Sequence, residues 1–224
     1  MFYSFDNLHV NKYNETKIYK ELIMDKRIPK KINSIEKKER LAETCFYLIC
    51  EDGLENINSS IICDRAKVSV GTFYSYFKDK EDIISYSIEK YSKPILFPLY
   101  NNLNLLKFNK NTIDKTINKM INISLELHKM TKSSHIHLTN AIHYNENTLN
   151  SFKKLECEEL EAIYQKCLIN DFKDNNLKET IYTTLLLINT FVHDKIFNNQ
   201  SFIDYDKQQL ILTQTLLKLW NMHI

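Results

Sequence analysis

Hydrophobic residues recur along most of the chain at intervals of three and four positions, which is the period of an amphipathic helix. The first strong stripe runs through Leu41, Cys45, Leu48 and Ile49. Gly53 follows this stripe and is a natural helix end, because glycine adopts the left-handed conformation without a steric penalty. No segment with the two-residue period of a strand competes with the helical pattern. The pattern therefore predicts an all-α protein.

Short helices are expected directly after this first stripe. A hydroxyl or amide side chain at residues 58–60 can cap one of them, and residues 67–69 then leave room only for a tight turn. Ser69 can cap the next helix, over residues 70–77. Asp79 favours a further helix start, because the helix dipole attracts negative charge at that end.

The rest of the chain is expected to form longer helices. Pro94 and Pro98 interrupt the chain after the short helices, and residues 101–111 are expected to be a connection. Five helices are predicted beyond it, near residues 112–130, 133–144, 148–171, 177–197 and 205–222.

Composition narrows the classes of function. The formal charge is +2, so contact with nucleic acid would depend on local placement of charge. The chain has only two glycines and therefore lacks a P-loop and a dinucleotide-binding fingerprint. It also lacks G-x-S-x-G and H-E-x-x-H, so we expect no enzyme and no cofactor. The five cysteines form no C-x-x-C pair, which favours reduced thiols over a zinc site.

The sequence shows neither a signal peptide nor a membrane-spanning helix. Residues 1–10 do not resemble a signal peptide, and no apolar run approaches the roughly 20 residues of a membrane-spanning helix. We expect a cytoplasmic protein without a membrane partner.

The predicted helix over residues 70–77 has two different faces. Steps of roughly 100° per residue put three apolar residues on one side, namely Val70, Phe73 and Phe77. The other side carries small or hydroxyl-bearing residues, namely Gly71, Thr72, Ser75 and Tyr76, with Tyr74 at the boundary. A helix that reads DNA needs a slim, uncharged face of this kind to enter the major groove. Periodicity alone fits a core helix of a bundle equally well.

The segment from Leu41 to Tyr91 resembles the helix-turn-helix domain of the TetR family. The resemblance is strongest in the run V-S-x-G-T-F-Y-x-Y-F-x-x-K-E, which begins at Val68. It implies a DNA-binding domain over residues 34–92 and a helical effector-binding and dimerisation domain over residues 93–224. Lys67 departs from the family, which usually has glycine in the turn, and Cys63 replaces a small alanine.

The family resemblance assigns roles to particular residues. The positions that match family DNA contacts are Ser60, Thr72, Tyr74, Ser75, Tyr76 and Lys80. The resemblance also implies a homodimer that binds a palindromic operator, usually represses transcription, and is released by a small-molecule effector. Residues 1–33 form a basic N-terminal extension. It either follows the DNA backbone or enters the minor groove, or it is a solvated tail or a segment packed on the body of the protein.

The second domain is expected to contain both the dimer interface and the effector pocket. Apolar residues lie on more than one side of the helices 177–197 and 205–222, and we assign the homodimer contact to them. Met120, His128 and Tyr144 are candidate effector contacts. His135 and His137 are two positions apart and face opposite ways on a helix, so no metal clamp is predicted.

Two other functions stay open at this stage. One is a helical protein that binds a small molecule but no DNA. The other is a helical enzyme. Candidate acids for it are Cys157, Glu158, Glu159 and Glu161, although an acidic helix face is usually only solvated.

Overall fold

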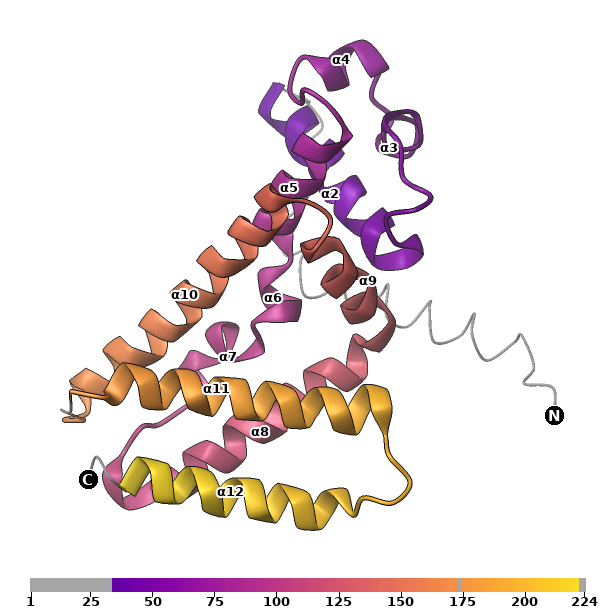
Figure 1. Cartoon of the computed structure of the whole chain (residues 1–224). Helices are drawn as coiled ribbons and strands as arrows, with labels where there is room; N and C mark the ends of the chain where they lie inside the picture. Colours follow the sequence, from indigo (N-terminus) through magenta and orange to yellow (C-terminus); the bar gives the residue numbers. More distant parts are fainter. Residues whose placement is uncertain (1–33, 173–174, 222–224) are drawn as a thin grey trace. The chain divides into compact units, whose positions relative to one another are not determined.

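The computed structural model describes residues 34–172 and 175–221 (Figure 1). Within these ranges every regular element is helical, and the predicted all-α fold with an N-terminal helix-turn-helix is confirmed. The basic extension, residues 1–33, lies outside the described residues.

The chain divides into two compact units. Of the described residues, the first contains 34–96 together with Ser133–Lys154, and the second contains Phe97–Lys132, 155–172 and 175–221. The sequence predicted a second domain that starts at residue 93. The structure instead groups the segment from Ser133 to Lys154 with the helix-turn-helix.

The first unit consists of the long helix α2 and several shorter helices. Its elements are α2 (Ser34–Asp52), α3 (Ser59–Ala66), α4 (Val70–Tyr74), α5 (Lys80–Tyr91) and α6 (Lys93–Leu96), with α9 (Lys132–Ile142) and the beginning of α10 (Glu146–Ile169). The predicted stripe of α2 is buried, since Leu41, Cys45 and Ile49 have no exposed surface. Gly53 ends α2 with φ +71°, as predicted.

The turn between α3 and α4 is defined by backbone geometry and caps. Lys67 has φ 55° and ψ 45°, in the left-handed region. Its N–H donates to the Asp64 carbonyl at 3.2 Å, and the N–H of Val68 donates to the Cys63 carbonyl at 3.0 Å. The expected departure at Lys67 is therefore real, and lysine occupies a conformation that glycine adopts without strain.

Side chains from α9 and α10 fasten these helices to α2 and α5. His137 Nδ1 donates to the Cys50 carbonyl oxygen at 3.0 Å, near the C-terminal end of α2. Lys154 and Glu89 form an ion pair at 2.6 Å. These long-range contacts explain why the segment 133–154 belongs to the first unit.

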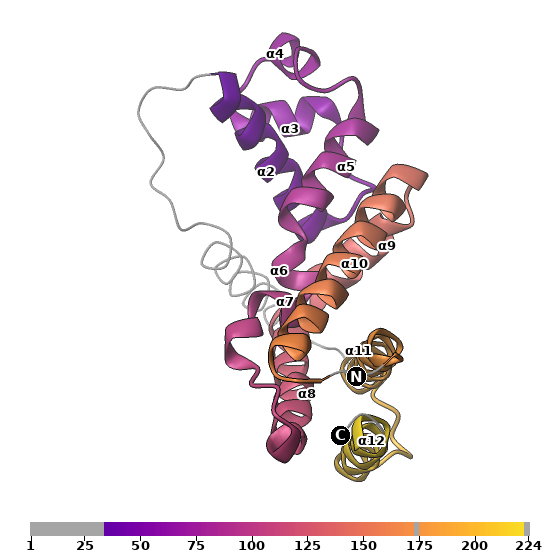
Figure 2. The same ribbon diagram turned by 90° about the vertical axis from the view of Figure 1, so that its left-hand side faces the viewer.

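The second unit is built on three long helices. Its elements are α7 (Pro98–Asn101), η1 (Leu103–Leu105), η2 (Lys110–Thr112), α8 (Ile113–Met130), the rest of α10, α11 (Leu177–His193), η3 (Asp194–Asn198) and α12 (Tyr205–Asn221). α11 and α12 run side by side, and α8 packs on both (Figures 1 and 2). The region predicted as a connection, residues 101–111, begins at the end of α7 and contains η1 and the start of η2.

The predicted apolar stripe of α11 faces the core of the second unit. Leu177, Ile181, Ile188 and Val192 have no exposed surface. Trp220 of α12 is also fully buried, and its indole Nε1 donates to Thr184 Oγ1 at 2.9 Å. The stripe therefore holds α11 and α12 together within one chain.

Aromatic rings complete the surroundings of Trp220. The ring of Phe108 stacks on the indole with centroids 5.9 Å apart, and the ring of Phe172 meets it edge-on at 5.5 Å. Among the described residues, no helix is long and apolar enough to cross a membrane.

We expect Trp220→Ala to lower the free energy of unfolding by about 3–5 kcal/mol, because it empties a buried site that the chain cannot refill. Urea unfolding followed by far-UV circular dichroism measures the change, since Trp220 is the only tryptophan and its fluorescence is lost. Lys218→Ala, on the exposed side of the same helix, should change stability by less than about 0.5 kcal/mol. An equally small effect of both changes would contradict the core position of Trp220.

We expect Lys67→Gly to be more stable than Lys67→Ala by about 1 kcal/mol, because alanine keeps the left-handed strain and glycine removes it. Both variants lose the same charged side chain, so their difference isolates the backbone. The measurement is the midpoint of urea unfolding, and equal midpoints would mean that the turn adopts another conformation in solution.

Candidate nucleic-acid interface

The candidate interface is built on α4, whose start is fixed by side-chain caps. Asn58 Oδ1 accepts from the Ile61 N–H at 2.9 Å at the start of α3. Ser69 Oγ accepts from the Thr72 N–H at 3.3 Å at the start of α4. Both caps were predicted, and together they set the direction in which the chain enters and leaves the turn.

Two phenylalanines anchor α4 on the protein. Phe73 has no exposed surface and Phe77 is 2% exposed. Their ring centroids lie 5.8 Å apart, and Phe77 also meets Tyr86 of α5 edge-on at 5.5 Å. The inward face predicted from the sequence is confirmed at these two positions.

The prediction is wrong for Val70 and for the length of the helix. Val70 is 43% exposed, and α4 ends at Tyr74. The chain then continues as a tight turn in which the N–H groups of Tyr76 and Phe77 donate to the Phe73 carbonyl, both at 2.9 Å. α4 has only five helical residues. Phe73 and, in the turn that follows, Phe77 are buried, whereas Val70 at the start of the helix stays partly exposed.

The outer side of α4 carries the predicted contact residues. Tyr74 is 57% exposed. Ser75 is exposed and its Oγ donates to the Gly71 carbonyl at 3.0 Å, while Thr72 Oγ1 and Ser69 Oγ lie 2.9 Å apart. Tyr76 is only half-buried. The hydroxyls of Thr72 and Ser75 are thus held in place by local hydrogen bonds.

Gly71 leaves open space on the same surface, and Ser60 contributes a hydroxyl group to it. A Cβ atom added at Gly71 would meet nothing within 4 Å. The chain's own packing therefore does not require glycine at this position, and the backbone of α4 is open to close approach from outside. Ser60, at the start of α3, is exposed as well.

Lys80 has a structural partner that sequence reasoning missed. Its Nζ donates to the Leu54 carbonyl oxygen at 3.2 Å, and the Tyr144 ring centroid lies 5.8 Å away. Leu54 is distant in sequence and its carbonyl carries no side-chain signal, so no motif could have revealed the bond. Lys78, in contrast, is exposed and remains available to a phosphate.

A cluster around Glu39 holds α2 against α5 behind the candidate interface. The Glu39 carboxylate accepts from Tyr86 Oη at 2.8 Å and from Tyr91 Oη at 3.0 Å, and it pairs with Lys90. Burial opposes ionisation of Glu39, but the bonds from Lys90, Tyr86 and Tyr91 together lower the pKa of its carboxyl. The charged cluster therefore fixes the helix pair that carries α4.

The predicted effector residues lie in different units. Met120 is fully buried in the core of the second unit, and His128 of α8 is 1% exposed. Tyr144 belongs to the first unit, where its hydroxyl donates to Glu81 Oε1 at 3.0 Å. The structure therefore does not assign the three residues to one pocket of a single unit.

A groove of about 730 Å³ lies between α11 and α12 in the second unit. Leu187, Phe191, His193, Ile211 and Leu212 contribute to its lining, together with polar residues such as Asn189 and Gln208. None of the predicted effector residues lines this groove.

Comparisons with known proteins agree with this geometry. The family model for bacterial regulatory proteins of the tetR family matches residues 46–86. An HTH-type transcriptional regulator of Staphylococcus aureus strain bovine RF122 is 36% identical over 58 residues, which cover 26% of this chain and 31% of that protein. A second such regulator, from strain USA300, is 36% identical over 55 residues, which cover 25% and 30%. The chain thus spans about a third of the length of these curated relatives.

The fold extends the likeness beyond the matched segment. A solved structure from Rhodococcus sp., described as a TetR-family transcriptional regulator, superposes with a TM-score of 0.54 at 13% identity. The superposition covers 81% of this chain and 99% of that one. At this identity the comparison concerns the fold alone. Residues 46–86 thus carry a helix-turn-helix segment of the tetR type, and the chain shares its helical fold with that solved structure.

Proposed function

We propose that this protein is a transcriptional regulator that binds a specific site on double-stranded DNA through α4 and the start of α3. The observation that carries the proposal is the two-sided character of α4 and of the turn that follows it. Phe73 and Phe77 are buried, while Tyr74 and Ser75 are exposed. A short helix with this division can enter the major groove, which is about 12 Å wide, without losing its anchor in the protein.

The chemistry of the outer side supports DNA over a protein partner. From Val70 to Phe77 the chain has no acidic residue that would repel phosphate. The serine, threonine and tyrosine hydroxyls can donate to or accept from base edges and phosphates. The open space at Gly71 lets a nucleic-acid backbone come close to the chain.

The phosphate contact predicted for Lys80 is part of the proposal, with Lys78 added to it. Lys80 would meet phosphate only by sharing or leaving its bond to the Leu54 carbonyl. Lys78 offers an exposed ammonium group at the same end of the interface. We therefore assign the phosphate contact to both lysines and expect Lys80 to support the interface structurally as well.

The proposal includes a homodimer that binds a palindromic operator. Its support is the outer side of α11 and α12, where Leu186 is 52%, Leu210 is 58% and Ile211 is 61% exposed. Apolar side chains gathered in this way on two adjacent helices favour a second protein surface. Two copies related by a two-fold axis would present two α4 helices to successive major grooves, roughly 34 Å apart.

The proposal also includes repression that a small-molecule effector relieves. An effector that binds one conformation of the second unit better than another shifts the population of DNA-competent dimers. Met120 and His128 in the second unit and Tyr144 in the first remain predicted effector contacts.

We expect Tyr74→Ala to weaken DNA binding by about five- to 150-fold, because a well-placed base contact contributes about 1–3 kcal/mol. Gly71→Ala should also weaken binding while the protein stays folded, since the added methyl group has space within the chain. Fluorescence anisotropy with a duplex selected in vitro from random sequence measures both. Phe202→Ala, which removes a 79% exposed aromatic ring of the second unit, is the matched control. Unchanged affinity in Tyr74→Ala and Gly71→Ala would remove α4 from the interface.

We expect Leu186→Lys combined with Ile211→Lys to convert the dimer into a monomer at micromolar concentration. Each replaced side chain contributes about 1.5–3 kcal/mol when it is buried in a contact, and the lysines bring like charges together. Sedimentation equilibrium measures the mass. Ile169→Lys, at an 82% exposed position of α10, should leave the dimer intact. A double variant that still sediments as a dimer would place the contact elsewhere.

A further inference from the structure

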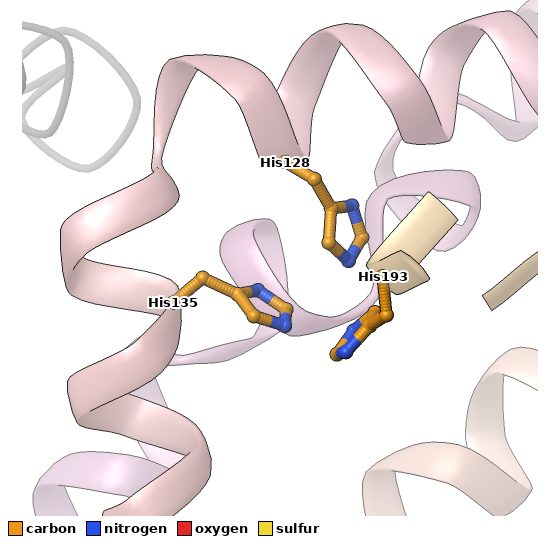
Figure 3. Close-up of side chains that lie close together, drawn as sticks. All are labelled: His128, His135 and His193. Atoms are coloured by element: carbon orange, nitrogen blue, oxygen red, sulfur yellow. The ribbon is translucent and has the colours of Figure 1, made fainter. Parts of the chain in front are cut away.

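Two histidine rings meet edge to face within the second unit (Figure 3). His128 lies on α8, and His193 is the last residue of α11. Their ring centroids are 5.2 Å apart with planes at 64°. His128 is 1% exposed and His193 is half-buried. The helices thus bring together two imidazoles that are far apart in the sequence.

The hydrogen bonding of His128 fixes which nitrogen carries the proton. Nδ1 lies 2.8 Å from the carbonyl oxygen of Ser124, one turn earlier on α8. A carbonyl oxygen can only accept, so Nδ1 carries the hydrogen and Nε2 has the lone pair. This bond from the second nitrogen to a backbone carbonyl is the arrangement that orients metal-bound histidines in proteins.

Distance and protonation also suit a metal ligand pair. One nitrogen of each ring lies within 4.8 Å of the other. Burial is the main cause that lowers the pKa of His128 to about 4, and burial also lowers the pKa of His193. Both rings are therefore neutral near pH 7, and the neutral imidazole is the form that binds a metal.

The chain after His193 is held in an unusual shape. Asp194–Asn198 form a π-helix, which is rare and frequently found at functional sites. The Tyr205 hydroxyl donates to Asp194 Oδ2 at 2.9 Å. Asn199 follows with φ 46° in the left-handed region. These bonds fix the end of α11, and with it the position from which His193 projects.

We propose that His128 and His193 form a binding site for a divalent transition-metal ion of the zinc type. Imidazole suits zinc, copper and nickel, whereas magnesium and calcium prefer oxygen ligands. Zinc–nitrogen distances of about 2.0–2.1 Å keep two nitrogens on one ion within about 4.2 Å of each other, which is compatible with a pair that lies within 4.8 Å. The other coordination positions belong to water or an added ligand, so the ion exchanges more readily than in a four-ligand structural site.

The aromatic ring of Phe197 borders the proposed site. Its centroid lies 5.2 Å from that of His193 and 6.5 Å from that of His128. An apolar neighbour of this kind limits the access of water and strengthens the bond between a cation and its nitrogen ligands. The site is confined to the second unit, and His135, which Figure 3 also labels, belongs to the first.

The test is zinc binding by the full chain after treatment with a chelator, measured by isothermal titration calorimetry. We expect one zinc ion per chain, and at least tenfold weaker binding in His193→Asn and in His128→Gln. Circular dichroism melting without metal confirms that both variants are folded. His193→Asn keeps the test valid if the fully buried His128 does not tolerate replacement. Magnesium should not bind.

Two control variants distinguish zinc binding at this site from zinc binding by other histidine or cysteine side chains. His143→Ala removes an exposed histidine, and Cys157→Ser removes an exposed thiol. Both variants should bind zinc as the unchanged protein does. Absence of zinc binding in the unchanged protein, or wild-type affinity in a folded His193→Asn variant, would overturn the proposal. Neither outcome depends on DNA binding, so the proposed regulator function is tested separately.

Discussion

The burial of Phe73 and Phe77 is the contact on which the candidate interface depends. α4 has only five helical residues, and a helix of that length has no stability of its own. Its conformation comes from the Ser69 cap and from the two aromatic rings packed on the preceding helices and on α5. Because these rings occupy the inner side, the backbone at Gly71 and the side chain of Tyr74 are forced outward. The surface proposed to read DNA is thus the exposed side of the segment whose inner side Phe73 and Phe77 hold against the protein.

The support behind that anchor is polar. Glu39 joins α2 to α5 through two tyrosine hydroxyls and Lys90, and Lys80 joins the start of α5 to the Leu54 carbonyl. Hydrogen bonds to a charged group are stronger than neutral ones, and their directions restrict how the helices can shift. The first unit is therefore held together by its apolar interior and by the hydrogen bonds of the charged Glu39 and Lys80 side chains. The segment 133–154 is fastened to the same unit through His137 and Cys50.

The second unit differs from the first because α11 and α12 are apolar on more than one side. Their inner sides close around Trp220 and leave exposed leucine and isoleucine on the outside. The same helix that supplies the proposed dimer surface ends in His193, next to His128 of α8. A metal ion at this pair would connect two of the three helices that form the core of the unit, without using residues of the proposed DNA interface.

Local order in this protein follows from the sequence, and long-range proximity does not. The helical period, the cap at Ser69, the stop at Gly53 and the inward phenylalanines could all be predicted, because each depends on residues within one or two turns. The exposure of Val70, the bond of Lys80 to Leu54 and the meeting of His128 with His193 could not. Each depends on where one helix lies against another, and that is decided by the packing of side chains from distant parts of the chain.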